Sequence, residues 1–414
     1  MNRKSIASWC LYDFANSFYV AVIPATVWSV YYAQSIVGNE TGQGDLWWGR
    51  AVSLSMAFVA VTSPLLGGLS DFAGIRKRLL IGYTVAAVVA TALLATVEPG
   101  MVLWGFLLSM LANVGFEGAL VFYNAYLPEL APRDHQGRLS GWGFATGYAG
   151  SFVGLLVALP FVRRGDYGIA FAVIAGCYLF FAVPAFLWLP RDAAASLTVR
   201  QAAAGGFKAA WKTQKEILRL PDLRRFLLAY FLFEDGVITV INFSSLFAAT
   251  TLGFRMEQLI LLFAVVQVAA LAGAFAWAKP TDRLGPKFVV LLMLVQWSLV
   301  VTAVYFVKTQ TQFFVLAAIA GTGLGAIQAA ARAFYATLVP AGREAEFFGF
   351  YALCGKSAAI LGPLAFGTLS AATGGNQRVA ILSVLAFYLI GAVLITGSKA
   401  GGPTHLPAHA TAEQ

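Results

Sequence analysis

The apolar positions of the chain gather into twelve long runs, separated by short connections that carry proline, glycine or charge. A helix that crosses a bilayer needs about 20 mostly apolar residues. Each run has about that length, so the pattern predicts twelve membrane-spanning helices. They cover residues 8–33, 47–70, 79–97, 101–124, 139–162, 168–189, 223–249, 256–279, 287–306, 311–336, 349–370 and 377–397.

Composition strengthens the prediction of an all-α membrane protein. Only 11% of the 414 residues are charged and 59% are hydrophobic, whereas a soluble domain has about 25% charged residues. The three cysteines lie far apart in apolar runs, and the three histidines lie outside those runs. This arrangement predicts no disulfide framework, no metal site and no cofactor.

The distribution of Lys and Arg predicts the orientation. Twenty of the 28 fall in connections on the side of the N-terminus, six on the other side, and Arg332 and Lys356 lie within spans. Positive charge favours the cytoplasmic side, so we expect both termini inside and a multi-pass protein of the cell (inner) membrane. The first run contains Asp13 and Asn16 and no cleavage site follows it, which predicts a retained helix and not a signal peptide.

The longest connection divides six spans from six. We expect a bundle over 1–189, a linker over 190–222, a second bundle over 223–398 and a disordered tail over 399–414. In the linker, Phe207, Trp211 and Leu218 recur at helical spacing among basic residues. Such a pattern suits a helix on the cytoplasmic leaflet, in contact with anionic lipids; a solvated linker is the alternative. We interpret the net charge of +9 as cytoplasmic loops that face anionic lipid, and not as a sign of nucleic-acid binding.

The two sets of six spans contain an internal repeat. Asp71, Gly74 and Arg76 follow the second span, and Asp282, Gly285 and Lys287 follow the eighth in the same D-x-x-G-x-[RK] pattern. A second match follows spans four and ten. It aligns Ala125, Leu130, Pro132 and Gly141 with Ala333, Leu338, Pro340 and Gly349. Parallel halves related by an axis along the membrane normal are typical of transporters.

The stretch GGLSDFAGIRK at 67–77 resembles the loop motif of the major facilitator superfamily. The first span, WCLYDFANSFYVAVI, and the seventh, LLAYFLFEDGVITVI, resemble the vacuolar amino-acid effluxer family of fungi and its bacterial relatives. The resemblance covers all twelve spans. It implies two pseudo-symmetric six-helix bundles and the export of amino acids or similar solutes.

The loop motif is predicted to form part of a cytoplasmic gate. Gly67 and Gly74 permit close helix approach and a tight turn. Asp71 can cap a neighbouring helix or pair with a cation such as Arg76, and either contact can break on opening. Asp282, Gly285 and Lys287 are the matched elements of the second half. The alternative is that the cations only anchor the loop at the leaflet.

Polar residues within spans one and four are the first candidates for a site, because an ionisable residue costs about 2.5–3.5 kcal/mol at mid-membrane. Asp13 and Asn16 share one face of the first span. Asn113 and Glu117 share one face of the fourth, where Glu117 is the preferred candidate for proton coupling. A structural hydrogen bond to a neighbouring helix is the alternative role for Glu117.

Spans seven and ten supply the next candidates. Asp235 and Asn242 follow a helical stripe, which favours Asp235 over Glu234 as the carboxylate that faces a cavity. Arg332 is the preferred partner for an anionic substrate group, because its fork matches a carboxylate. An ion pair with one of the intramembrane carboxylates is the alternative for Arg332. Gln328 and Tyr335 share its stripe.

Span eleven contains Lys356, which aligns with Tyr148 of span five; a lysine that extends to the interface is the alternative reading. Together these positions form the expected substrate and coupling sites. The substrate candidates are Arg332, Asp235, Asn242, Asn16, Gln328, Tyr335, Lys356, Tyr148 and Asn113, and the proton-coupling candidates are Glu117, Asp13 and Glu234.

The function predicted from these features is secondary active transport of a small amino acid or related zwitterion or anion, by alternating access, with proton coupling and with export favoured. The alternative is a lipid or amphiphile translocase on the same fold. No nucleophile–base pair lies within the spans and no P-loop is present, so we expect neither an enzyme nor an ATP-driven pump. The expected partners are the small-molecule substrate and the lipid bilayer, and the expected state is a monomer.

Overall fold

The computed structural model describes residues 3–130, 133–192, 198–339 and 344–398, and every regular element within them is a helix. The predicted tail, together with Pro132 and Pro340 of the repeat, lies outside these ranges. The N-terminal half comprises α1 (Arg3–Val22), α2 (Val27–Tyr31), η1 (Tyr32–Val37), α3 (Gln43–Phe72), α4 (Arg76–Leu93), η2 (Leu94–Thr96), α5 (Val102–Asn124), α6 (Leu127–Leu130), α7 (Arg133–Arg164) and α8 (Tyr167–Trp188).

The linker forms α9, and the C-terminal half follows it. Their bounds are α9 (Val199–Arg219), α10 (Pro221–Leu252), α11 (Met256–Leu284), α12 (Pro286–Phe306), α13 (Gln310–Leu338), α14 (Glu344–Ser357), α15 (Leu361–Ala372) and α16 (Gln377–Thr396). Among the described residues, eleven helical segments are long and apolar enough to cross a membrane. The remaining predicted span, 47–70, lies within the 30-residue helix α3.

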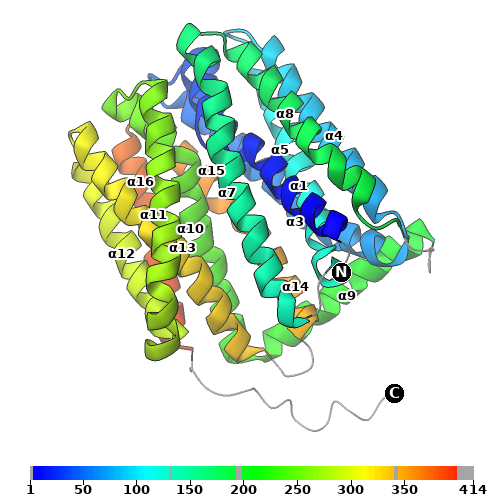
Figure 1. Cartoon of the computed structure of the whole chain (residues 1–414). Helices are drawn as coiled ribbons and strands as arrows, with labels where there is room; N and C mark the ends of the chain where they lie inside the picture. The colour runs from blue at the N-terminus through cyan, green and yellow to red at the C-terminus, as the bar shows by residue number, and fades with distance from the viewer. Residues whose placement is uncertain (1–2, 131–132, 193–197, 340–343, 399–414) are drawn as a thin grey trace, which may run out of the picture.

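The helix packing repeats between the two halves. In the N-terminal half α1 packs on α8, α3 on α5, and α4 on both α5 and α8. In the C-terminal half α10 packs on α16, α11 on α13, and α12 on both α13 and α16. In both halves the first span packs on the sixth, the second on the fourth, and the third on the fourth and sixth. The repeated sequence motifs predict such a match. The halves meet through α3 against α15 and α14, and through α7 against α11. Figure 1 shows the two groups of helices side by side.

Each half closes its first span against its last at one end of the molecule. The Ser5 hydroxyl at the start of α1 donates to the Trp188 carbonyl at the end of α8 (2.8 Å). The Arg225 guanidinium at the start of α10 donates to the Gly397 carbonyl beyond α16 (2.8 Å). We call this end the base; it is the lower end in Figure 1, where α9 also lies. The opposite end, where η1 passes into α3 and α15 into α16, is called the far end.

Two spans are broken near their middle. The first stops at Val22 and resumes at Val27, with Pro24 in the gap. Proline breaks a helix because it lacks an N–H and clashes with the preceding turn. Span eleven stops at Ser357 and resumes at Leu361. There Ala359 has φ +148°, a conformation that residues with a Cβ rarely adopt. Broken helices are tolerated at membrane depth where the irregular backbone lines a cavity.

Candidate functional site

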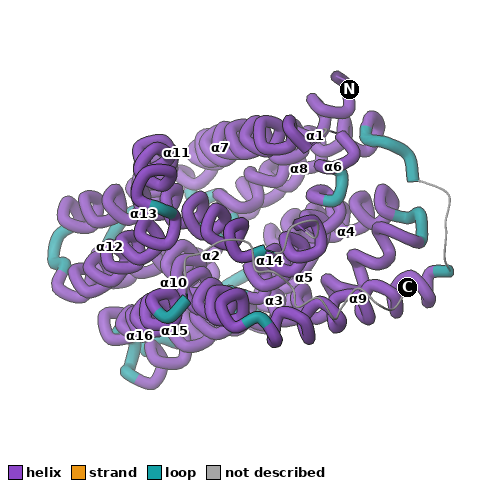
Figure 2. Tube along the Cα trace, turned by 90° about the horizontal axis from the view of Figure 1, so that it is seen from below, coloured by secondary structure: helices purple, strands orange, loops and turns teal. Residues whose placement is uncertain are grey.

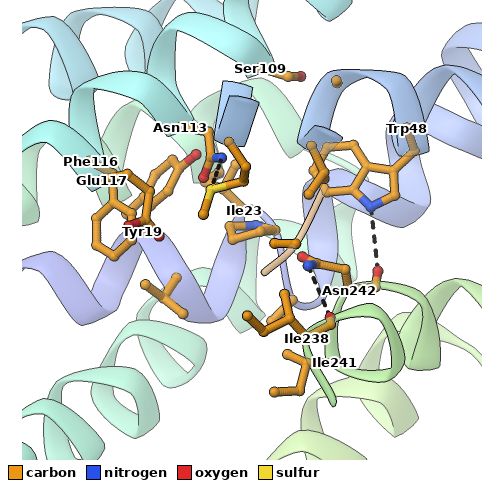
Figure 3. Close-up of a pocket in the computed structure, with 17 residues that line it drawn as sticks. Tyr19, Ile23, Trp48, Ser109, Asn113, Phe116, Glu117, Ile238, Ile241 and Asn242 are labelled. Carbon is orange, nitrogen blue, oxygen red and sulfur yellow. Dashed lines mark hydrogen bonds between the residues drawn. The ribbon is translucent and has the colours of Figure 1, made fainter. Parts of the chain in front are cut away.

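A cavity of about 220 Å³ lies between the two halves, and both helix breaks border it. Its wall includes Pro24 from the break in span one and Ala359 from the break in span eleven. The wall is mostly apolar, and its polar side chains include Ser109, Asn113, Glu117 and Asn242. Figure 3 draws Asn113 and Glu117 on one side of this central cavity and Asn242, with Ile238 and Ile241, on the other. Discontinuous spanning helices commonly surround transporter sites.

An ion pair joins the two halves at this cavity. The Lys356 ammonium lies 2.8 Å from the Glu117 carboxylate and donates to the Glu117 carbonyl at 3.1 Å. The two side chains are 16% and 19% exposed, so the pair is largely screened from solvent. Lys356 is the penultimate residue of α14, just before the break, and Glu117 lies within α5. Lys356 therefore turns inward to the other half, and the extension to the interface that was its alternative reading is wrong.

The two asparagines of the cavity are held by their amide nitrogens. The Asn113 amide donates to the Ser55 hydroxyl of α3 at 2.6 Å, and the Asn242 amide donates to the Ile238 carbonyl one turn earlier on α10 at 3.0 Å. These bonds use the NH₂ groups, and leave the carbonyl oxygens of both side chains as acceptors at the cavity wall. Asn113 and Asn242 are thus placed as the sequence stripes predict.

Asp235 does not face the cavity, which corrects the assignment made from the stripe on span seven. Its side chain is fully buried, and its two oxygens accept hydrogen bonds from the backbone N–H groups of Leu361 (3.0 Å) and Gly362 (2.9 Å). The carboxylate therefore caps the N-terminus of α15, where the helix leaves unpaired N–H groups and a partial positive charge. Helical periodicity alone could not reveal this partner, since the break that creates it lies in another span.

The two carboxylate oxygens of Glu234, the residue next to Asp235, differ in their hydrogen bonding. The Gln328 amide of α13 donates to Glu234 Oε1 at 2.6 Å, while Oε2 is buried and has no hydrogen-bond partner among the described residues. Arg332 follows one turn after Gln328, acts electrostatically on Glu234 and has an exposed side chain. Arg332 forms no ion pair with the described charged residues, so the alternative of a fixed intramembrane pair is wrong in this conformation. It lies outside the wall of the central cavity.

Four other candidates also lie away from the central cavity. Asp13 contacts α7 at Gly143 and Gly147, and the Asn16 amide donates back to Asp13 at 3.3 Å. Tyr335 is fully buried and donates to the Phe347 carbonyl at 2.6 Å, so it ties α13 to α14. These contacts make Asn16 and Tyr335 packing residues here, which corrects their assignment to the substrate. Tyr148 is partly exposed on α7.

The two loop motifs adopt matching backbone geometry. Gly74 has φ +61° and Gly285 has φ +86°, conformations that favour glycine. The side chains of Asp71 and Asp282 lie outside the described part of the structure. Arg76 pairs with Glu129 at 2.9 Å, a partner that the sequence did not indicate. A Cβ built on Gly67 meets no atom of the described residues within 4 Å, so the close approach expected there is not seen among them in this conformation.

A second correspondence at the base differs from the sequence alignment. The Lys77 ammonium donates to the Leu189 carbonyl at the end of α8 (2.8 Å), and Lys287 donates to the Thr396 carbonyl at the end of α16 (3.0 Å). Each lysine therefore ties the third span of its half to the sixth. Lys287 aligns with Arg76 in sequence, but it makes the same kind of contact as Lys77. The reason is that Arg76 instead pairs with Glu129 of α6.

The far end holds a buried polar network that the sequence did not indicate. Asp45, at the start of α3, is fully buried and accepts hydrogen bonds from Asn39 (2.9 Å), from Gln377 (2.8 and 3.0 Å) and from the Ser370 hydroxyl. Ser370 and Gln377 belong to the other half. We call these four residues the far-end network. All four lie in connections or at span ends, where polar residues are common. Only the nearby glycines indicate, in the sequence, that backbones approach closely at this place.

Glycines bring the backbones together beside the far-end network. A Cβ on Gly49 of α3 would lie 2.3 Å from the Pro363 carbonyl oxygen, and a Cβ on Gly367 of α15 would lie 2.6 Å from the Asp45 carbonyl oxygen. Such spacing admits only glycine and is typical of tightly packed membrane helices. Between described residues, the hydrogen bonds and the ion pair that join the halves lie at the far end or at the central cavity.

Comparison with known proteins identifies the family. Residues 50–400 match the family described as vacuole effluxer Atg22 like. The chain is 31% identical over 404 residues to the uncharacterized MFS-type transporter YxiO of Bacillus subtilis, covering 95% of this chain and 94% of that protein. It is 24% identical to autophagy-related protein 22 of Yarrowia lipolytica, covering 83% and 73% of the two chains.

Solved structures share the fold at low sequence identity. The nucleoside transporter NupG superposes with a TM-score of 0.70 at 14% identity, over 95% of this chain and 99% of that chain. The D-xylose-proton symporter gives a TM-score of 0.70 at 15% identity, over 97% and 98%. Relatives and fold together describe a multi-pass membrane transporter and not an enzyme. The chain belongs to the Atg22-like vacuole effluxer family of the major facilitator superfamily (MFS).

Proposed function

We propose that this protein is a secondary active transporter that moves a small zwitterion, an amino acid with an apolar side chain, by alternating access. In this proposal α3 completes a set of twelve spans, the base faces the cytoplasm and the direction is export. The Lys and Arg bias supports the orientation. The family description, vacuole effluxer, supports export as the direction.

The observation that carries the substrate class is the Glu117–Lys356 pair. Its two charges belong to opposite halves, and Glu117 lies in the wall of the cavity with Lys356 paired to it. An amino acid offers an ammonium to Glu117 and a carboxylate to Lys356, so it can replace the direct pair while satisfying both charges. Because leaving either charge buried and alone is costly, the substrate lowers the barrier to separating the halves.

The rest of the cavity indicates the size and character of the side chain. Its volume of about 220 Å³ lies below the range of about 300–1,000 Å³ that suits drug-sized ligands. Its mostly apolar wall favours a hydrocarbon group, and the amide oxygens of Asn113 and Asn242 offer two further acceptors for an ammonium. Arg332, exposed nearer the base, is proposed to attract the carboxylate before it reaches Lys356.

Proton coupling is proposed to reside on Glu117. When the halves separate, Glu117 loses its Lys356 partner and can take up a proton, so the charge state of the pair follows the transport step. Glu234 is the second candidate, because one of its oxygens is buried without a partner. Asp13, packed against α7, is the third. In the proposed state the far end is closed, so substrate exchanges with the cavity from the cytoplasmic base.

A thermal-shift screen of the purified protein tests the substrate class. Apolar amino acids are expected to raise Tm more than the corresponding amines or carboxylic acids, which carry only one of the two charges. Lys356→Met should remove the effect, Arg332→Ala should weaken it, and Lys308→Ala, which changes a cation far from the cavity, should not alter it. Stabilisation that survives Lys356→Met, or that is equal for one-charge analogues, contradicts the proposal.

A lipid or amphiphile translocase is the second candidate, and one observation favours it. Another cavity of about 220 Å³ lies among α10, α11, α12 and α13, with Gln267, Ser244 and Ser245 among an otherwise mainly apolar lining. An acyl chain would suit such a cavity. Flipping of a fluorescent phospholipid in proteoliposomes, with no response to amino acids in the thermal-shift screen, would favour this function over the first.

A further inference from the structure

Helix α9 has three distinct faces: one buried, one apolar and exposed, and one basic. Successive residues of a helix are about 100° apart, so Ala202, Thr213 and Ile217 share one side, and all three are buried. On this side α9 packs against α3, α10 and α14. A capping box formed by Thr198 and Gln201 fixes its start. The helix is thus a firmly attached part of the base; Figure 2 shows it beside α3 when the molecule is viewed from below.

The second face of α9 is apolar and exposed. Phe207, Trp211 and Leu218 recur at i, i+4 and i+11, and their side chains are 52%, 51% and 52% exposed. Large apolar side chains in one stripe are not a normal water-facing surface. Because the buried face of α9 already meets the protein, this stripe needs a second apolar phase.

The third face is basic and adjoins the apolar stripe. Lys208, Lys212, Lys215 and Arg219 lie about a quarter turn from Phe207 and Trp211, and all are exposed. The two faces meet where the Lys215 ammonium lies 5.5 Å from the centre of the Trp211 ring. A lysine in that position buries its stem beside the ring and keeps its charge at the boundary between apolar and polar surroundings.

We propose that α9 is a bilayer-binding surface, with its apolar stripe in the acyl boundary and its basic face on anionic phospholipid headgroups. An aromatic and aliphatic stripe beside a row of cations is the composition of helices that lie in the plane of a membrane. The position of α9 across the base places it where the spanning helices leave the bilayer (Figure 1). The basic row matches the anionic charge of a cytoplasmic leaflet.

Attachment to the membrane has a consequence for the two halves. The buried face of α9 contacts α3 of the N-terminal half and α14 of the C-terminal half. A helix fixed to the leaflet along one side therefore gives both halves a common support at the base. The lipid surface proposed here does not depend on what the central cavity transports.

Site-directed spin labelling in proteoliposomes tests the proposal. A functional variant without Cys10, Cys177 and Cys354 receives one cysteine, at Trp211 or Phe207 on the stripe, or at Ala209, an exposed position on the opposite side of α9. With phosphatidylglycerol in the vesicles, labels at 207 and 211 should be several-fold more accessible to oxygen than to a water-soluble nickel chelate. The label at 209 should show the reverse preference.

The basic face is tested by changing Lys208, Lys212, Lys215 and Arg219 to Gln together. This variant should retain several-fold less phosphatidylglycerol than the parent during purification, as measured by native mass spectrometry, and its label at 211 should become more accessible to the chelate. Monodispersity in detergent shows that it is folded. If the label at 211 is as open to the chelate as the label at 209 in every vesicle, the proposal is wrong. Protection from both reagents, with spin–spin broadening, would instead indicate a second copy on this face.

Discussion

The described contacts at the far end join the two halves, whereas those of the loop motifs at the base lie within one half. At the far end a buried carboxylate, Asp45, accepts hydrogen bonds across the interface from Ser370 and Gln377, and the backbones of α3 and α15 approach at glycines. At the base, Arg76 pairs with Glu129 and Lys287 donates to the end of α16, and each of these two contacts lies within one half.

This difference distinguishes two roles of contacts in a gated transporter. Contacts within a half make it rigid, whereas contacts between halves determine which end is closed. The far-end network consists of short side chains at backbone contact, so opening it breaks several charge-assisted bonds together. The Glu117–Lys356 pair lies between the two ends and is the contact that a substrate can replace. The ends can therefore be tested separately from the pair.

The largest effect is expected at the central pair. Lys356→Met leaves the Glu117 carboxylate partly buried without its cation and should destabilise this conformation by about 3 kcal/mol. Adding Glu117→Gln should recover most of that loss, because the isolated charge is gone. Thermal unfolding of the two single variants and the double variant in detergent measures the coupling. Additive losses in the double variant would mean that the two residues act independently.

The next effect is expected at the far end. Asp45→Ala removes an acceptor of several hydrogen bonds and should weaken the closed far end by about 2–3 kcal/mol, whereas Asp45→Asn keeps the shape and should cost less. Double electron–electron resonance between labels at Gly38 and Gly374, on opposite halves, should show a second, longer distance in Asp45→Ala. An unchanged distance distribution would show that the glycine contacts alone close this end.

A smaller effect is expected at the cap of α15. Asp235→Ala removes the acceptor for the Leu361 and Gly362 N–H groups and should lower stability by about 1–2 kcal/mol. Amino-acid binding should remain, because the side chain does not face the cavity. Thermal shifts with and without ligand separate the two effects. A loss of ligand response at unchanged stability would restore Asp235 as a substrate residue.

The smallest effects are expected at the loop motifs, where the two halves give matched variants. Gly74→Ala and Gly285→Ala place a Cβ at positive φ and should each cost about 1 kcal/mol in stability. Gly67→Ala, in an open helical position, should leave Tm unchanged or raise it slightly. A lower transport rate in Gly67→Ala at normal Tm would show that this glycine is needed for close approach in the other conformation.

The sequence predicts the helical fold well because the apolar spans and the repeat follow from local pattern. Pro24 marks one helix break, but nothing local marks the break at Ala359. The stripe on span seven predicts that Asp235 faces the cavity, because its partner, the start of α15, exists only once span eleven is broken. Lys356 and Glu117 are 239 positions apart, and each was a candidate alone, yet only the packed halves make them a pair. The sequence does not indicate Asp45 as a network residue, because carboxylates are common in connections and only the packing of the other half buries this one.

Transport of apolar amino acids into proteoliposomes, with and without a pH gradient, tests the central claim most directly. The wild-type protein should accumulate a mixture of radiolabelled apolar amino acids when a gradient is imposed. Glu117→Gln should lose the response to the gradient while still exchanging internal for external amino acid. Accumulation by Glu117→Gln that follows the gradient as in the wild type would contradict the coupling role, and no amino-acid movement by the wild type in either assay would contradict the proposed function.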